Sequence, residues 1–335
     1  MYAWVLHLVA HSDVMEEKNK KALIIGADGQ DGKFLTSLLN QENYRVLRTV
    51  KKLSRVKESK SVDVLDVRDT EKFKALVEDF VPDEIYNLAG MSSVSSSFQN
   101  PELCFETNSL AVKNMLAVLK EISPSVKFYQ SSSSEMFGDV SEPANEDTEF
   151  NPLSPYAESK VDAHLYCKHV RENEGVPVFS GILFNHESEF RPHGFVTRKI
   201  TSGLVEIFKG KTDRIELGDI SIIRDWGYAS DHVAAMHKMV VAGEPDDYVV
   251  ATGISHSLGG FINSALKILN LPGDIGDYIS INSNLFRVSE LRSSYANPNK
   301  INSILGWYPK YTFEQMIENM VRFEIKSEIS RSEVS

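Results

Sequence analysis

Tyr156 and Lys160, in the run Ser154-Pro-Tyr-Ala-Glu-Ser-Lys160, are the residues of this chain that most clearly indicate chemistry. Side chains four residues apart on a helix lie one above the other on the same face. A lysine ammonium beside a phenol favours the phenolate, so a side chain with an ordinary pKa of about 10 becomes a usable base. An exposed helix with an incidental Tyr–Lys pair is the alternative, and the surrounding sequence argues against it.

A serine-rich segment at residues 131–134 lies upstream of this pair and includes the triplet Ser133-Ser134-Glu135. Its composition alone would suit a flexible linker. However, a strand-like segment rich in β-branched and aromatic residues leads into it, and Glu-Met-Phe-Gly follows. We therefore expect an active-site loop at a strand end, with Ser133 and Glu135 as candidate catalytic residues. A solvent-exposed loop carboxylate is the alternative for Glu135.

A glycine-rich turn follows the first expected strand and opens the first expected helix. It reads Gly26-Ala-Asp-Gly29-Gln-Asp-Gly32. Glycines at this spacing allow a tight turn, close approach of the backbone to a pyrophosphate, and close packing of the helix on the sheet. The helix N-terminus adds unpaired N–H groups and the positive end of its dipole. The turn predicts a dinucleotide site with these contacts: Gly26, Gly29, Gln30, Asp31 and Gly32.

The end of the second expected strand distinguishes NADP from NAD. NAD sites usually carry an acidic residue there for the ribose hydroxyls, whereas a basic residue accommodates a 2′-phosphate. This chain has Lys51 and Lys52, with no acidic residue before Glu58. We therefore expect NADP rather than NAD; lysines that merely solvate a loop are the alternative. Residues at the ends of the next two strands fit adenine and ribose contacts: Asp66, Val67, Leu88 and Ala89.

Short apolar runs alternate with longer amphipathic stretches through the first half of the chain. Strands are expected at Lys21–Ile25, Arg45–Val50, Ser61–Val64, Glu84–Leu88, Val126–Gln130 and Val178–Leu183. Helices are expected near Thr70–Phe80, Pro101–Ile122 and Tyr156–Asn173, and around Phe34 to Leu39. Strands that alternate with helices predict βαβ units, and hence an α/β fold with a Rossmann-type doubly wound parallel sheet.

The pattern loosens beyond Asn185, where Gly, Pro and Asn interrupt it. We expect an N-terminal extension at residues 1–20, an NADP-binding Rossmann domain at 21–185, and mainly a smaller mixed α/β substrate lobe at 186–335. Some segments of that last part are expected to return to the Rossmann domain. Met15 directly precedes the first expected strand, which favours it over Met1 as the natural start.

The composition fits a cytoplasmic enzyme of 335 residues, with 42% hydrophobic and 25% charged residues. A net charge of −11 argues against nucleic-acid binding. The apolar start is too short to span a membrane. Two cysteines, Cys104 and Cys167, provide no disulfide framework and suit a reducing compartment. His164, Cys167 and His169 could suggest a metal, but no second group of ligands is nearby, so we expect no metal site.

Together these motifs resemble the extended short-chain dehydrogenase/reductases and, within them, the GDP-mannose 4,6-dehydratases. The resemblance runs from about Lys21 to Phe323. The glycine turn and the Tyr–Lys pair indicate only the superfamily. Three blocks in the substrate lobe are more specific: Asn185-His-Glu-Ser188, Phe195-Val-Thr-Arg-Lys-Ile200 and Arg224-Asp-Trp-Gly227. Other stretches contribute as well: Pro82–Leu88, Phe128–Gly138, Ala251–Gly253 and Leu305–Trp307.

The resemblance implies a role for each candidate catalytic residue. Tyr156 is the base for the sugar C4 hydroxyl, Lys160 lowers the pKa of the tyrosine and holds the nicotinamide ribose, and Ser133 hydrogen-bonds the C4 oxygen. Glu135 removes the C5 proton and helps to expel the C6 hydroxyl as water. A ketone at C4 acidifies the C5 proton, so a carboxylate nearby can serve first as base and then as acid. A plain reductase has no need of that carboxylate.

The resemblance also implies a nucleotide-sugar site. Asn185, Lys199, Arg224 and Arg287 would contact the nucleotide and its diphosphate, and Glu290 would contact the ribose. An arginine suits this task because its planar fork matches phosphate oxygens, whereas surface salt bridges are the alternative for Lys199 and Arg224. The remaining expected substrate contacts are Ser92, Glu187, Val196 and Gly218.

The chain departs from the family pattern in places. Ser133 stands where threonine is usual, and the hydroxyl is kept. The loop from Lys51 to Asp63 is shorter than is typical, which favours a homodimer over the family's homotetramer. The stretch Glu189-Phe-Arg-Pro-His193 also diverges, so the sugar could be a heptose or part of another GDP- or NDP-sugar. Two further functions stay open: an NADP-dependent sugar-nucleotide reductase or epimerase, and a catalytically silent binding protein.

Overall fold

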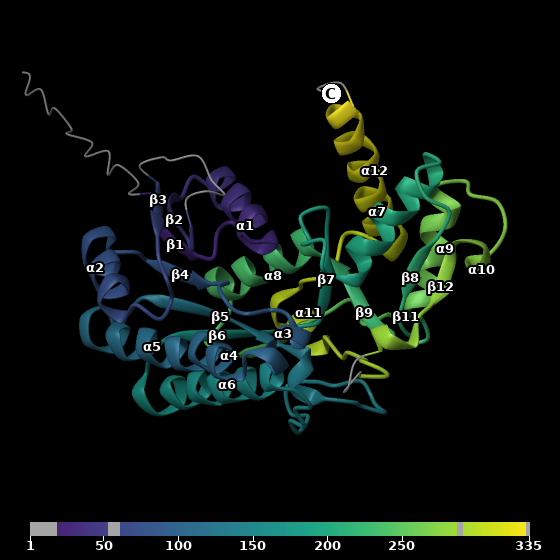
Figure 1. Ribbon diagram of the computed structural model, residues 1–335. Coiled ribbons are helices and arrows are strands. Elements are labelled where there is room, and N and C mark those ends of the chain that lie inside the picture. The colour runs from purple at the N-terminus through teal and green to yellow at the C-terminus, as the bar shows by residue number, and fades with distance from the viewer. Residues whose placement is uncertain (1–18, 53–60, 287–290, 333–335) are drawn as a thin grey trace, which may run out of the picture.

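A seven-stranded parallel sheet in the order β10-β6-β5-β4-β1-β2-β3 runs through the larger half of the molecule (Figure 1). The computed structural model describes residues 19–52, 61–286 and 291–332. The strand order reverses at β1, which is the doubly wound arrangement that the sequence predicts. The strands are β1 (Lys21–Ile25), β2 (Arg45–Val50), β3 (Val62–Val64), β4 (Glu84–Asn87), β5 (Lys127–Ser133), β6 (Val178–Leu183) and β10 (Asp247–Val250).

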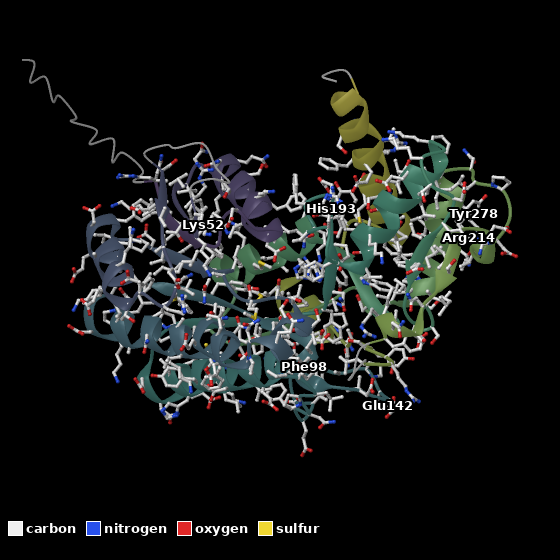
Figure 2. The ribbon with its side chains drawn as sticks, viewed as in Figure 1. Lys52, Phe98, Glu142, His193, Arg214 and Tyr278 are labelled. Atoms are coloured by element: carbon white, nitrogen blue, oxygen red, sulfur yellow. The ribbon has the colours of Figure 1, made fainter. Side chains whose placement is uncertain are left out.

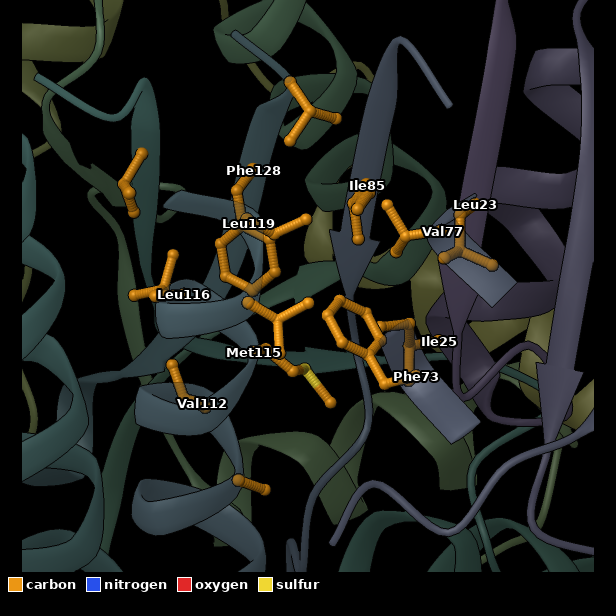
Figure 3. Close-up of a cluster of buried hydrophobic side chains, with 14 of the residues drawn as sticks. Leu23, Ile25, Phe73, Val77, Ile85, Val112, Met115, Leu116, Leu119 and Phe128 are labelled. Atoms are coloured by element: carbon orange, nitrogen blue, oxygen red, sulfur yellow. The ribbon is translucent and has the colours of Figure 1, made fainter. Parts of the chain in front are cut away.

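Helices cover both faces of this sheet, so its strands are apolar on both sides. Leu23 and Ile25 of β1 point to one face and Ala22 and Ile24 to the other. The first face packs on α2 (Thr70–Phe80), α5 (Ala111–Ile122) and α6 (Pro155–Glu174), and Figure 3 shows part of that core. The second packs on α1 (Gln30–Gln41), α8 (Ala229–Ala242) and α11 (Asn299–Leu305).

The smaller half carries a core of its own around Trp226 and Phe261. Its strands are β7 (Asn185–Glu187), β8 (Ile215–Leu217), β9 (Ile223–Tyr228), β11 (Ser255–Ser257) and β12 (Ile279–Ile281). Its helices are α7 (Val196–Phe208), α9 (Leu258–Ile268), α10 (Ile275–Tyr278) and α12 (Phe313–Ser332). β7 begins two residues after β6 ends and lies on the side of the smaller half that faces the large sheet (Figure 1). Among the helices of the described residues, none is long and apolar enough to cross a membrane.

Two stretches differ from the sequence-based expectation. Residues 101–122 form α4 (Pro101–Phe105), a π-helical turn at Glu106–Leu110 and then α5. The sequence predicts a strand-end loop at residues 131–134, but Ser131–Ser133 continue β5 and pair with Gly181–Leu183 of β6. Main-chain pairing with a neighbouring strand outweighs the poor strand propensity of serine here. A short 3₁₀ turn, Ser134–Phe137, follows the strand.

The glycine turn between β1 and α1 depends on close backbone contacts. Gly26 has a φ of +86°, and a Cβ there would lie 2.9 Å from the amide nitrogen of Ala89. A Cβ on Gly32 would lie 2.5 Å from the Cα of Ala27. Real Cβ atoms do not approach backbone so closely, so the turn requires glycine at these two positions.

We expect Gly32→Ala to lower the free energy of unfolding by at least about 2 kcal/mol, because the new methyl group meets backbone that cannot yield. Gly260 is the matched control: it occupies the equivalent third position of α9, and a Cβ there would lie 3.4 Å from the Ser257 hydroxyl oxygen. Gly260→Ala should leave stability unchanged or raise it by up to about 1 kcal/mol. Urea unfolding of both variants tests this, and equal stabilities would contradict it.

Candidate active site

A cavity of about 350 Å³ lies at the carboxyl edge of the large sheet, between it and the smaller half. Ligands of open α/β sheets bind at this edge. The cavity is lined by all four predicted catalytic residues: Ser133, Glu135, Tyr156 and Lys160. It is also lined by seven of the predicted substrate contacts: Ser92, Asn185, Glu187, Val196, Lys199, Gly218 and Arg224. Arg287 and Glu290, the other two, lie outside the described residues.

Two elements position the four catalytic side chains. β5 and the 3₁₀ turn after it carry Ser133 and Glu135, and the Ser133 hydroxyl accepts a hydrogen bond from the Glu135 amide at 3.3 Å. α6 carries the tyrosine and the lysine. Its first turn is fixed by the Ser154 hydroxyl, which accepts from the Ala157 amide at 3.1 Å, and by a proline at the first helical position.

Burial dominates the electrostatics of Tyr156 and Lys160. It lowers the pKa of Lys160 to about 8. It raises the pKa of Tyr156 to about 12, although a hydrogen bond with Ser133 acts in the opposite direction. The lysine Nζ donates to the Ser131 carbonyl at 2.9 Å and lies 5.9 Å from the centre of the tyrosine ring. The sequence predicts that Lys160 lowers the pKa of this tyrosine; in the protein alone the largest effect is removal of the phenolate from water, which raises the pKa.

Gln30 and Asp31, at the start of α1, connect the two halves of the molecule. The Asp31 carboxylate lies 3.1 Å from Nε2 of His186 in β7. Gln30 donates to the His186 carbonyl at 3.0 Å and accepts from the Ser188 hydroxyl at 2.8 Å. Asp31 also lines the cavity. The Gln30 side chain does not, because its amide group bonds His186 and Ser188. The sequence predicts both as cofactor contacts; their visible partners belong to the substrate half.

Arg191 is a cavity-lining residue that the sequence analysis did not single out. Its guanidinium lies 3.0 Å from the buried Glu187 carboxylate and 3.9 Å from the centre of the Phe195 ring. Its positive charge helps to lower the pKa of Asp31 and opposes the rise in the pKa of Tyr156, so it lies near the two. The sequence feature that could have identified Arg191 is its position as an arginine in the loop directly before α7. Figure 2 labels His193, two residues further along the same loop, between the two halves.

Asn108 is a buried supporting residue that the sequence analysis also did not single out, and it lies in the π-helical turn. Its side chain bonds the Met91 amide at 2.8 Å, the Met91 carbonyl at 3.0 Å and the Ser159 hydroxyl at 3.2 Å. It therefore fixes the loop after β4 against α6, next to Lys160. π-Turns inside helices are common at functional sites, but their position is not visible in a sequence pattern.

Arg224 and Lys199 reach the cavity from the smaller half. Arg224 is buried, and its guanidinium donates to the Leu291 carbonyl at 2.8 Å. The next residue, Asp225, points away and accepts hydrogen bonds from the Thr252 and Gly253 amides at 2.9 and 2.7 Å. Lys199 is exposed at the start of α7 and donates to the Glu216 carbonyl at 2.6 Å.

The remaining predicted cofactor residues follow the ends of β1 to β4, and all of them except Leu88 lie outside the cavity lining. Gly26, Gly29 and Gly32 form the turn, Ala89 packs against it, and Leu88 alone of this group lines the cavity. Lys51 and Lys52 are exposed after β2, as Figure 2 shows for Lys52. Asp66 pairs with Arg68 at 2.8 Å, and hydrogen bonding with Arg68 lowers its pKa to about 2. Val67 is buried in the core.

The described ranges contain no group of three His, Cys, Asp or Glu side chains that could hold a metal ion. His164 instead contacts Ser132 and Asp247. The side chain of His169 contacts Asn173 and Glu174. These three helical residues, His164, Cys167 and His169, therefore do not converge on one point.

Comparisons with known proteins agree with this geometry. The family model described as GDP-mannose 4,6 dehydratase matches residues 23–320. GDP-mannose 4,6 dehydratase 2 of Arabidopsis thaliana is 36% identical over 332 residues, which cover 93% of this chain and 88% of that protein. GDP-mannose 4,6-dehydratase of Vibrio cholerae is 33% identical over 351 residues, covering 92% and 94%. GDP-mannose 4,6 dehydratase of Dictyostelium discoideum is 34% identical over 347 residues, covering 93% and 98%.

Solved structures share the fold. The Thermus thermophilus UDP-glucose 4-epimerase complex with NAD superposes with a TM-score of 0.80 at 23% identity, covering 91% of this chain and 99% of that one. RMD from Pseudomonas aeruginosa complexed with NADPH gives 0.78 at 23% identity, covering 92% and 100%.

The Asp31–His186 pair predicts a defined pH dependence of stability. Burial opposes both charges, but their mutual attraction lowers the pKa of Asp31 and raises that of His186. The aspartate contribution is present above its ordinary pKa of 3.8, and the histidine contribution is complete below its ordinary pKa of 6.5. Between these values Asp31→Asn should cost at least about 2 kcal/mol of unfolding free energy. The cost should shrink as the pH rises through the raised pKa of His186.

Urea unfolding of the wild type and Asp31→Asn across a pH series measures this cost. Asp66→Asn is the control, because it breaks a pair with Arg68, whose guanidinium stays charged in the alkaline range. The effect of that control should not change as the pH rises through the neutral range. A cost for Asp31→Asn that is equally flat would contradict the assignment of charge to His186.

Proposed function

Because the chain belongs to the GDP-mannose 4,6-dehydratase family, we propose that it converts GDP-mannose, or a close GDP-sugar, to the 4-keto-6-deoxy sugar nucleotide. The observation that carries this proposal is that Glu135 lines the same cavity as Tyr156, Lys160 and Ser133. A hydro-lyase needs an acid–base carboxylate as well as the base for oxidation, whereas a simple reductase does not. The enzyme is a nucleotide-sugar 4,6-dehydratase.

The dinucleotide site fits a nicotinamide cofactor. In the turn after β1, the backbone at Gly26 lies so close to Ala89 that there is no room for a side chain at Gly26. The helix that follows presents its N-terminus, which favours a pyrophosphate. We propose NADP, with Lys51 and Lys52 receiving the 2′-phosphate, because no acidic residue lies at that position of β2. Arg191 supports the binding of an anionic cofactor, since it faces the cavity near Asp31.

Tyr156 and Lys160 serve the oxidation at C4. Tyr156 accepts the proton of the C4 hydroxyl while the Ser133 hydroxyl orients the same oxygen. To do so, the phenol must first be ionised, and the Lys160 ammonium favours this. When bound, an oxidised nicotinamide supplies a hydride acceptor for C4, later a hydride donor for C6, and a positive charge that further favours the phenolate.

Glu135 serves the elimination. Its carboxylate accepts the C5 proton, made acidic by the C4 ketone, and gives it to the departing C6 hydroxyl, which leaves as water. C5 must then regain one proton, and Tyr156 still holds the one from C4. The protons therefore balance within the cavity. Burial, which raises the pKa of Tyr156 to about 12, helps the phenol to retain that proton between the two steps.

The smaller half recognises the nucleotide part of the substrate in this proposal. Arg224 and Lys199 offer positive charge to a diphosphate, and both line the cavity. Ser92, Asn185, Glu187, Val196 and Gly218 form further walls of the site. Glu187 is held by Arg191 and by the Thr197 hydroxyl at 2.6 Å, so its contribution is to shape the wall.

Incubation with GDP-mannose and a catalytic amount of NADP+ tests the function. We expect loss of one water from the sugar nucleotide, seen by mass spectrometry, without net accumulation of NADPH. Net NADPH formation would instead indicate a simple dehydrogenase, and an isomer of unchanged mass an epimerase. Replacing NADP+ by NAD+ should lower kcat/KM, and equal values would reject the NADP assignment. Turnover of another nucleotide sugar alone would change only the substrate.

Glu135→Gln isolates the second half of the reaction. We expect the rate of water loss to fall by about 10²- to 10⁴-fold, because the amide cannot exchange the C5 proton. One equivalent of reduced cofactor should still form on each active site, seen by absorbance, since Tyr156 and Lys160 are intact. Cofactor affinity should stay unchanged. A variant that loses both half-reactions equally while remaining folded would contradict the division of roles.

We further propose a homodimer. Four large apolar side chains are exposed on elements that pack together: Phe98 of α3 (Val94–Gln99), Phe105 of α4, Leu110 of the π-turn and Leu165 of α6. Figure 2 labels Phe98 at the surface. The Lys113 ammonium lies 6.0 Å from the Phe105 ring and 5.6 Å from that of Tyr166, so α4, α5 and α6 share this face. Several large exposed apolar side chains on neighbouring elements favour association.

Light scattering after gel filtration tests the dimer. The wild type should show twice the mass of the 37.6 kDa chain, and Leu165→Glu should shift it to the monomer. Val241→Glu is the control, because Val241 is similarly exposed but lies on α8, which packs on the other face of the sheet. A wild-type monomer, or a dimer that withstands Leu165→Glu, would reject this surface. A fourfold mass would indicate the tetramer.

A further inference from the structure

A row of buried polar side chains runs from Ser132 in the cavity wall into the protein, and the proposed mechanism gives it no role. The Ser132 hydroxyl lies 3.0 Å from Nδ1 of His164, and Nε2 of the same ring lies 3.6 Å from the Asp247 carboxylate. Arg171 donates two hydrogen bonds to Asp247, at 2.9 and 2.8 Å. All four side chains are buried, and burial of polar groups is costly unless they bond one another.

The position of His164 links the two elements that carry the site. It lies on α6, one turn beyond Lys160 and two turns beyond Tyr156. Its partner Ser132 lies on β5, directly before Ser133. The bond between Ser132 and His164 therefore connects the strand that ends in Ser133 and Glu135 with the helix that carries the other two catalytic groups.

The donor and the acceptor of the bond between Ser132 and His164 can be assigned. Burial lowers the pKa of His164, so the ring is neutral and carries one N–H. Nε2 lies 3.6 Å from the Asp247 carboxylate, which electrostatically favours the tautomer with the hydrogen on Nε2. Nδ1 is then left as the acceptor for the Ser132 hydroxyl. The edge of the Phe150 ring packs on the imidazole at 5.3 Å and restricts its rotation.

We propose that His164 is a positioning residue that keeps Ser133 and Glu135 in register with Tyr156 and Lys160. Asp247, held by Arg171, orients the ring, and the ring holds β5 against α6 through Ser132. This inference rests on the proposed function, because only a two-stage reaction uses both pairs of groups on the same substrate. The consequence is that oxidation and elimination are coupled: the C4 ketone must react with Glu135 before it leaves the cavity.

A loosened register should affect the second stage more than the first. Oxidation needs Tyr156 and Lys160, which stay together on α6. Elimination also needs Glu135, which approaches the sugar from β5. A displacement of about 1 Å between reacting groups can cost on the order of 10²-fold in rate. The ketone would then be released before elimination, leaving reduced cofactor behind.

His164→Phe keeps a ring of similar size and removes the hydrogen bond to Ser132. We expect kcat for water loss to fall by about 10²-fold, while KM for GDP-mannose changes little. The ratio of reduced cofactor to dehydrated product should rise by at least about tenfold. His164→Asn places an amide oxygen near the position of Nδ1, so it should restore most of kcat and bring the ratio back toward the wild-type value.

His237→Phe is the matched control. His237 lies on α8, and its Nδ1 lies 3.0 Å from the Tyr86 hydroxyl on β4, outside the cavity. This change should lower the melting temperature without altering the ratio of reduced cofactor to product. Ser132→Ala serves if His164→Phe does not fold, because it removes the same bond from the other side. The double variant should be no slower than the slower single variant.

The outcomes separate the two proposals. If the wild type does not dehydrate a GDP-sugar, the proposed function fails and the coupling ratio is undefined. If the wild type is active but folded His164→Phe or Ser132→Ala retains both kcat and the ratio, the positioning role is wrong. A loss of kcat with an unchanged ratio of reduced cofactor to product would also reject the positioning role, since a merely structural residue lowers the amount of active enzyme without separating the two stages.

Discussion

The contact on which the site depends is the one between the start of α1 and β7. Asp31 pairs with His186, and Gln30 bonds both the His186 carbonyl and the Ser188 hydroxyl. These bonds attach the smaller half to the glycine turn, and the cavity lies where the halves meet. The pair is partly buried, with side-chain exposures of 20% for Asp31 and 12% for His186, so breaking it would leave an uncompensated charge largely shielded from water. The relative position of the sugar site and the cofactor turn is therefore strongly specified.

The same enclosure determines the acid–base chemistry. In water a lysine would be fully charged and a tyrosine would titrate near a pKa of about 10. In the cavity, burial brings the pKa of Lys160 down to about 8 and that of Tyr156 up to about 12. Burial thus disfavours the charged form of both groups, although a lysine with a pKa of about 8 is still mostly an ammonium at neutral pH. Oxidation is coupled in this way to the arrival of cofactor and substrate, because their charges compensate for the missing water.

In the sequence blocks expected to bind substrate, only some residues face the cavity. The other residues hold the neighbouring loops in place. Within Arg224-Asp-Trp-Gly227 the arginine faces the cavity, while Asp225 fixes the turn at Thr252 and Gly253. Gly227 has no side chain because His232, which stacks on His186 at 4.7 Å, occupies that space. A short motif thus combines one binding group with residues that hold the neighbouring loops in place.

The sequence by itself determined the α/β fold and the four candidate catalytic residues. The bounds of β1, β2, α2 and β6 agree with prediction, because hydrophobic period and turn chemistry are local properties. The tertiary structure decided what depends on distant partners. Ser131–Ser133 became strand through pairing with β6, and Arg191 and Asn108 gained their roles through contacts across the fold. Tyr156 and Lys160 were visible as a pair, but their pKa values follow from burial, which no spacing encodes.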